Sequence, residues 1–249
     1  MQIKKYTLDN GLVVYFLPDD SKHNVEVKLV VKFGGLSKAF IVDGKKFFFN
    51  DGMAHLLEHY ILEASEYGLL VQEFNKRYML SNGYTNKFRT LYYFDAVKYI
   101  DEGLELLIKG IHSPIFTKER LEFVKNAIRE EIRMSQDSRS RRLLELEASQ
   151  LFKNISFCSV IGTIDEIDAV MLDTVKHIFK TFYIPKNEMI FISGNFEEEK
   201  MLQKIKKMYS DLTFEKHDIK SITIEEPKEV SKKEDVLYFP VAEPIYELT

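Results

Sequence analysis

Five consecutive residues, His55-Leu56-Leu57-Glu58-His59, constrain this chain more than any other stretch. In an α-helix, residues three and four positions apart share one face, so both imidazoles and the carboxylate would project from the same side. Two neutral imidazoles at this spacing can hold one divalent metal ion, and the carboxylate between them can reach a water on that ion. The order is the inverse of the commoner His-Glu-x-x-His zinc motif. The segment therefore predicts a helix that carries a zinc site.

A third ligand is needed, and a helix expected over residues 117–134 offers one. Its apolar stripe runs through Leu121, Val124 and Ile128, and the next position at this spacing is Glu131. A carboxylate in an apolar stripe is costly to bury alone, so a metal ion is a fitting partner. The alternative is that Glu131 lies at the edge of the stripe and reaches water. Glu130 points about 100° away from it.

The composition is that of a folded chain with a substantial core. It has 249 residues, of which 45% are hydrophobic, and a formal net charge of −4. This charge, with Lys and Arg scattered, argues against a nucleic-acid or anionic-membrane partner. There is no apolar signal segment at the start and no window of about 18 apolar residues, so we expect a soluble, cytoplasmic protein. Cys158 is the single cysteine, which excludes an internal disulfide and a thiolate metal cluster within one chain.

Hydrophobic periodicity and turn residues predict a mixture of strands and helices. We expect a hairpin over 6–18 with its turn at 9–11, then strands over 24–33, within 81–96 and over 189–193. The motif helix begins near Asp51, and further helices are expected over 69–78, 100–111, 117–134 and 172–182. A last helix follows Asn195, which with Glu198 has the pattern of a capping box.

The chain divides by composition into three parts. Residues 1–217 have the pattern of one compact zinc-site domain, and residues 218–235 form a charged linker rich in Glu, Lys and Ser. Residues 236–249 are strand-like again. A strand with nothing after it to pair with suggests a shortened chain with the stub of a second domain, or a C-terminal arm that joins another body.

Several longer segments resemble the pitrilysin/insulinase family of zinc peptidases, the inverzincins, and are most similar to its bacterial processing-peptidase-like members. They occur in order along the chain, at 51–59, 71–77, 82–85, 89–94, 127–134, 162–167 and 182–185. The family's carboxylate ligand follows its second His at the separation between His59 and Glu131. The resemblance implies an α+β fold with a mixed or antiparallel sheet covered by helices, the repeating half-domain of mitochondrial-processing-peptidase-like metallohydrolases.

Carried over to these positions, the resemblance implies one zinc ion held by His55, His59 and Glu131. Glu58 would be the general base that activates the metal-bound water of an endopeptidase acting on peptides or unfolded segments. The peptide would add as a strand along the sheet edge near Asn82, Gly83, Tyr84 and Thr85. Without the resemblance, these four residues would be interpreted as a polar turn.

Two consequences concern activity and partners. Val124 stands where the family usually has a further carboxylate, so one group that would support the metal site is missing. The family closes its active site between two similar halves, so a second half-domain or a homo- or hetero-oligomer is the expected partner for full activity. Two alternatives remain open: a non-catalytic or weakly active partner of a two-part peptidase, and a small-molecule metal lyase with the same motif and a cysteine ligand, for which Cys158 lacks the setting.

Overall fold

A computed structural model describes residues 2–154, 160–222, 225–238, 240 and 243. Its main sheet has six strands in the order β1-β2-β8-β3-β7-β6. The strands are β1 (Lys4–Thr7), β2 (Val13–Pro18), β8 (Glu188–Gly194), β3 (Val25–Val31), β7 (Thr90–Ala96) and β6 (Leu80–Thr85). β2 pairs with β8 in parallel, and the other neighbouring pairs are antiparallel. The sheet is mixed, and β6 forms one of its edges.

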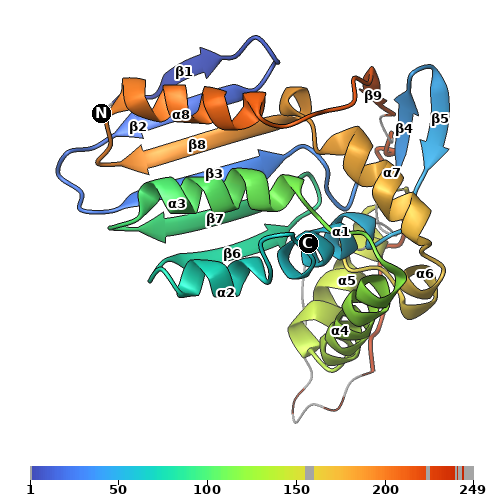
Figure 1. Ribbon diagram of the computed structural model, residues 1–249. Helices are drawn as coiled ribbons and strands as arrows, with labels where there is room; N and C mark the ends of the chain where they lie inside the picture. The colour runs from blue at the N-terminus through green and yellow to red at the C-terminus, as the bar shows by residue number, and fades with distance from the viewer. Residues whose placement is uncertain (1, 155–159, 223–224, 239, 241–242, 244–249) are drawn as a thin grey trace.

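Helices cover one face of this sheet (Figure 1). They are α1 (Met53–Glu63), α2 (Leu70–Asn75), α3 (Ile100–Glu105), which continues as a π-helix over Leu106–Gly110, and α8 (Glu198–Ser210). Side chains alternate across a strand, and those on the helix side, such as Phe16, Val27 and Phe94, have no exposed surface. Burying each such side chain contributes roughly 1.5–3 kcal/mol. The hydrophobic core therefore lies between the sheet and this helical layer.

A second, three-stranded sheet and a group of helices complete the fold. The small sheet has the order β5-β4-β9 and consists of β4 (Ala39–Val42), β5 (Lys45–Phe48) and β9 (Ile219–Ser221). The remaining helices are α4 (Lys118–Gln136), α5 (Arg139–Leu151), α6 (Ile164–Asp168), α7 (Leu172–Phe182) and a 3₁₀ turn at Pro185–Asn187. α4 and α5 lie side by side near the β6 edge of the main sheet (Figure 1).

The predicted α+β fold, a mixed sheet covered by helices, is confirmed. The predicted capping box of Asn195 and Glu198 is wrong, because α8 begins after Glu197 and has no side-chain cap. Phe196 explains the difference: its ring packs edge-on against Phe16 at 5.0 Å, which commits the preceding residues to the loop that leaves β8. A capping box does occur at the start of α6, between Thr163 and Glu166.

The segment after α8 makes contacts with the rest of the chain. β9 lies within the range predicted as a charged linker and pairs with β4, and the Ser231 amide donates to the Gln150 carbonyl at 2.7 Å. Residues 236–238, within the predicted strand-like stub, are in no strand. Cys158 and residues 239, 241–242 and 244–249 lie outside the described residues, and the three-part domain division stays a prediction. None of the described helices combines the length and the apolar character that a membrane span requires.

Candidate metal centre and active site

Two glycines fix the start of α1, the helix that carries the motif. Gly52 has φ 77°, and a Cβ there would lie 2.4 Å from the Ile161 carbonyl oxygen. Gly162 also has φ 77°, and its Cβ would lie 2.8 Å from the Asp51 carbonyl oxygen. Left-handed backbone at such close approach favours glycine. The two segments can therefore pack against each other, and the Asp51 amide donates to Glu166 at 3.3 Å, which anchors the first turn of α1.

The opposite end of α1 is anchored to the start of α4. The fully buried Tyr60 accepts a hydrogen bond from the Thr117 amide at 2.9 Å, and its hydroxyl donates to the Ile115 carbonyl at 3.0 Å. Leu56, Leu57 and Ile61 are buried on the same helix. With this side of α1 in the core, the face at positions 55 and 59 is directed to α4, from which Glu131 extends.

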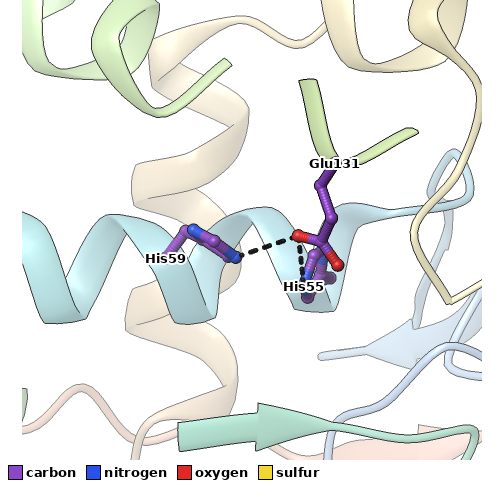
Figure 2. Close-up of side chains that lie close together, drawn as sticks. All are labelled: His55, His59 and Glu131. Carbon is purple, nitrogen blue, oxygen red and sulfur yellow. Dashed lines mark ion pairs between the residues drawn. The ribbon is translucent and has the colours of Figure 1, made fainter. Parts of the chain in front are cut away.

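Figure 2 shows His55 and His59 on successive turns of α1 with the Glu131 carboxylate between them. The Nε2 atoms of both histidines lie 3.5 Å from the same atom, Glu131 Oε2. One ligand atom from each residue lies within 4.8 Å of the other two. Ligands at about 2.0–2.1 Å from a tetrahedral zinc are separated from one another by roughly 3.3 Å. The two nitrogens and the carboxylate therefore fit a zinc ion in both type and spacing.

His59 also has the outer partner that metal-binding histidines usually have. Its Nδ1 lies 3.5 Å from Glu63 Oε1, on the same side of α1, and such a carboxylate orients the ring and raises the basicity of the other nitrogen. His55 Nδ1 is buried and has no hydrogen-bond partner among the described residues. Val124, which stands where the resembled family usually has a supporting carboxylate, is fully buried in the core.

The charges of the three residues differ in the metal-free protein. Burial, together with the nearby His59, lowers the pKa of His55 to about 4. Burial also opposes a charge on His59, but hydrogen bonds to Glu131 and Glu63 prevail and raise its pKa to about 9. The hydrogen bond from His59 lowers the pKa of Glu131. Near neutral pH the group therefore holds a proton on His59, and a metal ion would have to displace it.

Glu58 lines the same groove as these three residues and contacts β6. Its side chain is buried, and its Oε2 accepts a hydrogen bond from the Thr85 hydroxyl at 2.8 Å. Burial raises the pKa of Glu58, and the Thr85 hydrogen bond acts in the opposite direction. A Cβ at Gly83 would lie 3.0 Å from Glu58 Oε1, so a small residue at position 83 leaves room for this carboxylate.

A groove of about 820 Å³ contains all the site residues predicted from the sequence: the three expected ligands, Glu58, and residues 82–85. The other lining residues were not predicted as site residues, and they include Glu63, Phe123 and Arg141. The spacing from His59 to Glu63, one helical turn, is a signal that would have found the first. Arg141 lies on α5, a helix that was not predicted. A comparable cavity of about 760 Å³ near Tyr6 and Leu202 contains none of the predicted site residues.

Comparisons with known proteins find related sequences along most of the chain. Residues 14–158 match the family model described as Insulinase (Peptidase family M16), and residues 169–244 match that of the Peptidase M16 inactive domain. The Bacillus subtilis "Uncharacterized zinc protease YmfH" is 29% identical over 245 residues, which covers 95% of this chain and 56% of the relative. The Helicobacter pylori "Zinc protease PqqE" is 26% identical, and the match covers 93% of this chain and 52% of that protein. The chain spans about half the length of these curated relatives.

Solved structures have the same fold. An M16-like peptidase from Alicyclobacillus acidocaldarius superposes with a TM-score of 0.87 at 26% identity, covering 93% of this chain and 55% of that one. The first half of the periplasmic protease PqqL from Escherichia coli gives a TM-score of 0.76 at 20% identity, covering 91% and 49%. At 20% identity, the similarity to the first half of PqqL shows a shared fold alone.

Proposed function

The chain belongs to the insulinase family, peptidase family M16, and from this premise we propose that it is the zinc-binding half of an endopeptidase that hydrolyses peptides or unfolded segments. The observation that carries the proposal is the approach of both Nε2 atoms, of His55 and His59, to one oxygen of Glu131. Glu58 lies in the same groove. Homologues that carry the name zinc protease support the choice of metal.

His55, His59 and Glu131 would hold one zinc ion per chain, which leaves a fourth position open as in other catalytic zinc sites. A zinc ion held there would lower the pKa of a coordinated water and polarise the scissile carbonyl. Glu58 would act as the general base, accepting a proton from the attacking water and returning it to the leaving amine. Its buried position raises its pKa, towards the range in which a carboxylate can both accept and donate a proton.

The β6 edge offers a place for the peptide backbone. Within the described residues β6 pairs with one strand, β7, so the outward side of β6 is available for main-chain hydrogen bonds. The exposed Asn82 and Tyr84 alternate along β6 with Gly83 and Thr85, which face α1. An extended peptide would add here as a further strand, with its carbonyls beside the predicted zinc ligands. Recognition of this kind selects extended segments more than a particular sequence.

A second half-domain is the proposed partner, because the chain spans about half of its relatives and its groove is open to solvent along β6. Closing the groove would exclude water and strengthen the electrostatic interactions inside it. A weakly active or non-catalytic partner role is the second candidate, and the match to the Peptidase M16 inactive domain over 169–244 is the observation in its favour. Family membership gives no support to the metal-lyase alternative.

The deciding experiment compares the wild-type chain with Glu58→Gln at equal zinc content, using a quenched fluorescent peptide of unfolded character. Both proteins are assayed alone and with the second half supplied. We expect Glu58→Gln to keep its zinc and lose about 10²-fold to 10⁴-fold in turnover. Zinc binding with no hydrolysis in either condition would favour the non-catalytic role, and loss of zinc from Glu58→Gln would make Glu58 a ligand.

A further inference from the structure

The groove has two chemically different ends. At the C-terminal end of α1 its lining includes the apolar residues Leu62, Leu69, Val71 and Phe123, beside Glu63 and Gln72. Phe123, on α4, has 62% of its surface exposed although it is a large aromatic residue. Leu62 lies close to β6, because a Cβ at Gly83 would be 3.1 Å from its Cδ1. This end can contact an apolar side chain of a peptide that lies along β6.

The other end lies at the beginning of α1 and contains a positive charge. Ile161 packs against Gly52, immediately before α1, and lines the groove together with Arg141 from α5. α4 begins beside Tyr60 near the C-terminal end of α1, and further along it Glu131 lies beside His55 and His59. α5 begins at Arg139, directly after α4 ends at Gln136. Arg141 therefore lies beyond Glu131, on the side of the three predicted ligands that is opposite Phe123.

Among the described residues that line the groove, Arg141 is the single Lys or Arg. Each carboxylate there already has a partner: Glu58 has Thr85, Glu63 has His59, and Glu131 has both histidines. The guanidinium of Arg141 is less well satisfied. Its one ion pair in the described part of the chain is with Glu145 at 3.8 Å, longer than a hydrogen bond.

Glu145, moreover, is shared between two arginines. It also pairs with Arg142, at 3.5 Å. The side chain of Arg142 lies on the same helix and does not line the groove. If Arg141 releases Glu145, that carboxylate keeps Arg142 as its partner, and the N–H groups of Arg141 become available to a ligand in the groove. A guanidinium with available N–H groups binds a carboxylate through two parallel hydrogen bonds.

Resting on the proposed function, we propose that Arg141 is a specificity residue that receives an Asp or Glu side chain of the substrate on the side of the scissile bond opposite Phe123, with an apolar residue on the Phe123 side. The preferred substrates are then extended segments in which an apolar and an acidic residue flank the cleavage position. A carboxylate elsewhere in the groove would meet Glu58, Glu63 or Glu131 and be repelled, so the selection depends on position as well as charge.

The test measures peptide binding to the full zinc-loaded chain carrying Glu58→Gln, which prevents cleavage during the measurement. The probes are fluorescein-labelled peptides that contain one Phe and, at a fixed spacing, Glu, Gln or Lys, together with the same residues in reversed order. We expect the Glu peptide to bind about tenfold more tightly than the Gln peptide, the gain of a charge-assisted hydrogen bond. Adding Arg141→Gln should abolish this ratio, and adding Arg141→Glu should reverse it in favour of Lys. Arg142→Gln is the matched control and should keep the ratio.

Two other outcomes separate this inference from the proposed function. Peptides bound without regard to charge, or a ratio that survives Arg141→Gln, would overturn the Arg141 assignment and leave the peptidase proposal intact. If Arg141→Gln lowers zinc content but leaves the ratio unchanged, Arg141 supports Glu131 and does not select substrates. Failure of the zinc-loaded chain to bind any peptide would contradict both the Arg141 assignment and the peptidase proposal.

Discussion

Thr85 and Glu58 are joined by a hydrogen bond of 2.8 Å between the threonine hydroxyl and Glu58 Oε2. The same hydroxyl lies 3.1 Å from Thr90 Oγ1, and Thr90 donates to the Phe33 carbonyl at 2.9 Å. The side chain that orients the proposed general base is thus itself held by β7 and by the end of β3. A residue expected from the sequence to belong to the substrate strand therefore also contacts the carboxylate of the proposed general base.

Removing this hydroxyl should alter both the rate and its pH dependence. Thr85→Val keeps the shape of the side chain but removes the donor, and we expect turnover to fall about tenfold, the loss of one hydrogen bond to a charged group. Because a hydrogen bond to the ionised form lowers a pKa, its loss should raise the pKa of Glu58 and move the acid limb of the activity profile to higher pH. Thr85→Ser is the control, and it should retain the turnover and the acid limb of the wild type. An unchanged acid limb in Thr85→Val would remove Thr85 from this role.

The ligand assignment predicts a specific pattern of metal loss. His55→Ala, His59→Ala and Glu131→Ala should each remove most of the bound zinc, because three protein ligands are the usual catalytic set. Glu130→Ala should not, since Glu130 is exposed and forms an ion pair with Arg133 on the outer side of α4. The measurement is zinc per chain by elemental analysis after dialysis. Full zinc retention in the Glu131 variant would show that the third ligand is a different residue.

Zinc binding should displace protons from the protein. In the metal-free site at pH 6, His59 with a pKa of about 9 is protonated, whereas His55 with a pKa of about 4 is neutral. Zinc needs both imidazoles neutral, so uptake should release about one proton from the ligands. Titration calorimetry in buffers of different ionisation enthalpy measures this number. Glu58→Gln is the appropriate background because it removes the other titrating carboxylate; a release of two protons would show that His55 is charged as well.

The sequence was sufficient to choose four residues that line one groove, because their spacing is local or periodic. His55, Glu58 and His59 lie within one helical segment, and Glu131 continues an apolar stripe, so short-range geometry places all four on helix faces. Arg141 and Phe123 could not be predicted in this way. They enter the groove through the packing of α4 and α5 around α1, and α5 has no fully buried residue that would give it a strong apolar stripe.

The fold shows the same division between local and distant causes. The hairpin of β1 and β2 follows from alternation and an Asp-Asn-Gly turn, and it is confirmed. The hairpin of β4 and β5 was missed although its Asp43-Gly44 turn is a local signal. β9 could not be predicted, because it pairs with β4 across most of the length of the chain and lies in a segment with a linker-like composition. Pairing over that distance leaves no signal in either segment alone.

A buried ion pair outside the site should make stability depend on pH. His112 Nε2 lies 2.9 Å from Glu188 Oε1, both side chains are buried, and Tyr209 donates to the other oxygen at 2.8 Å. Burial opposes the charge on His112, but the Glu188 carboxylate and the Ile108 carbonyl outweigh it and raise its pKa above 6.5. Because folding raises the pKa of His112, its charge stabilises the folded state below about pH 6.5, the ordinary pKa of histidine. This contribution is lost as the pH rises through the pKa of His112 in the folded protein.

Urea unfolding of the metal-free chain between pH 6 and pH 9 tests this. The free energy of unfolding of the wild type should exceed that of His112→Gln most at pH 6, and the difference should shrink as the pH rises. His55 and His59 are present in both proteins, so their titration cancels in the comparison. His112→Ala, which leaves Glu188 buried without its cation, should cost about 3–5 kcal/mol. A difference that grows with pH would mean that the pair is neutral.

The last prediction is that the chain alone binds zinc but hydrolyses peptides weakly, and that activity rises when a second half-domain is supplied in cis or in trans. The chain spans about half of its relatives, and on the β6 side the groove is open to solvent. Charge that develops in the transition state would face bulk water there, where electrostatic stabilisation is weak. The measurement is hydrolysis with and without that half at equal zinc occupancy, with Glu58→Gln as the background. Full activity from a monodisperse monomer would show that the groove in this chain is sufficient by itself.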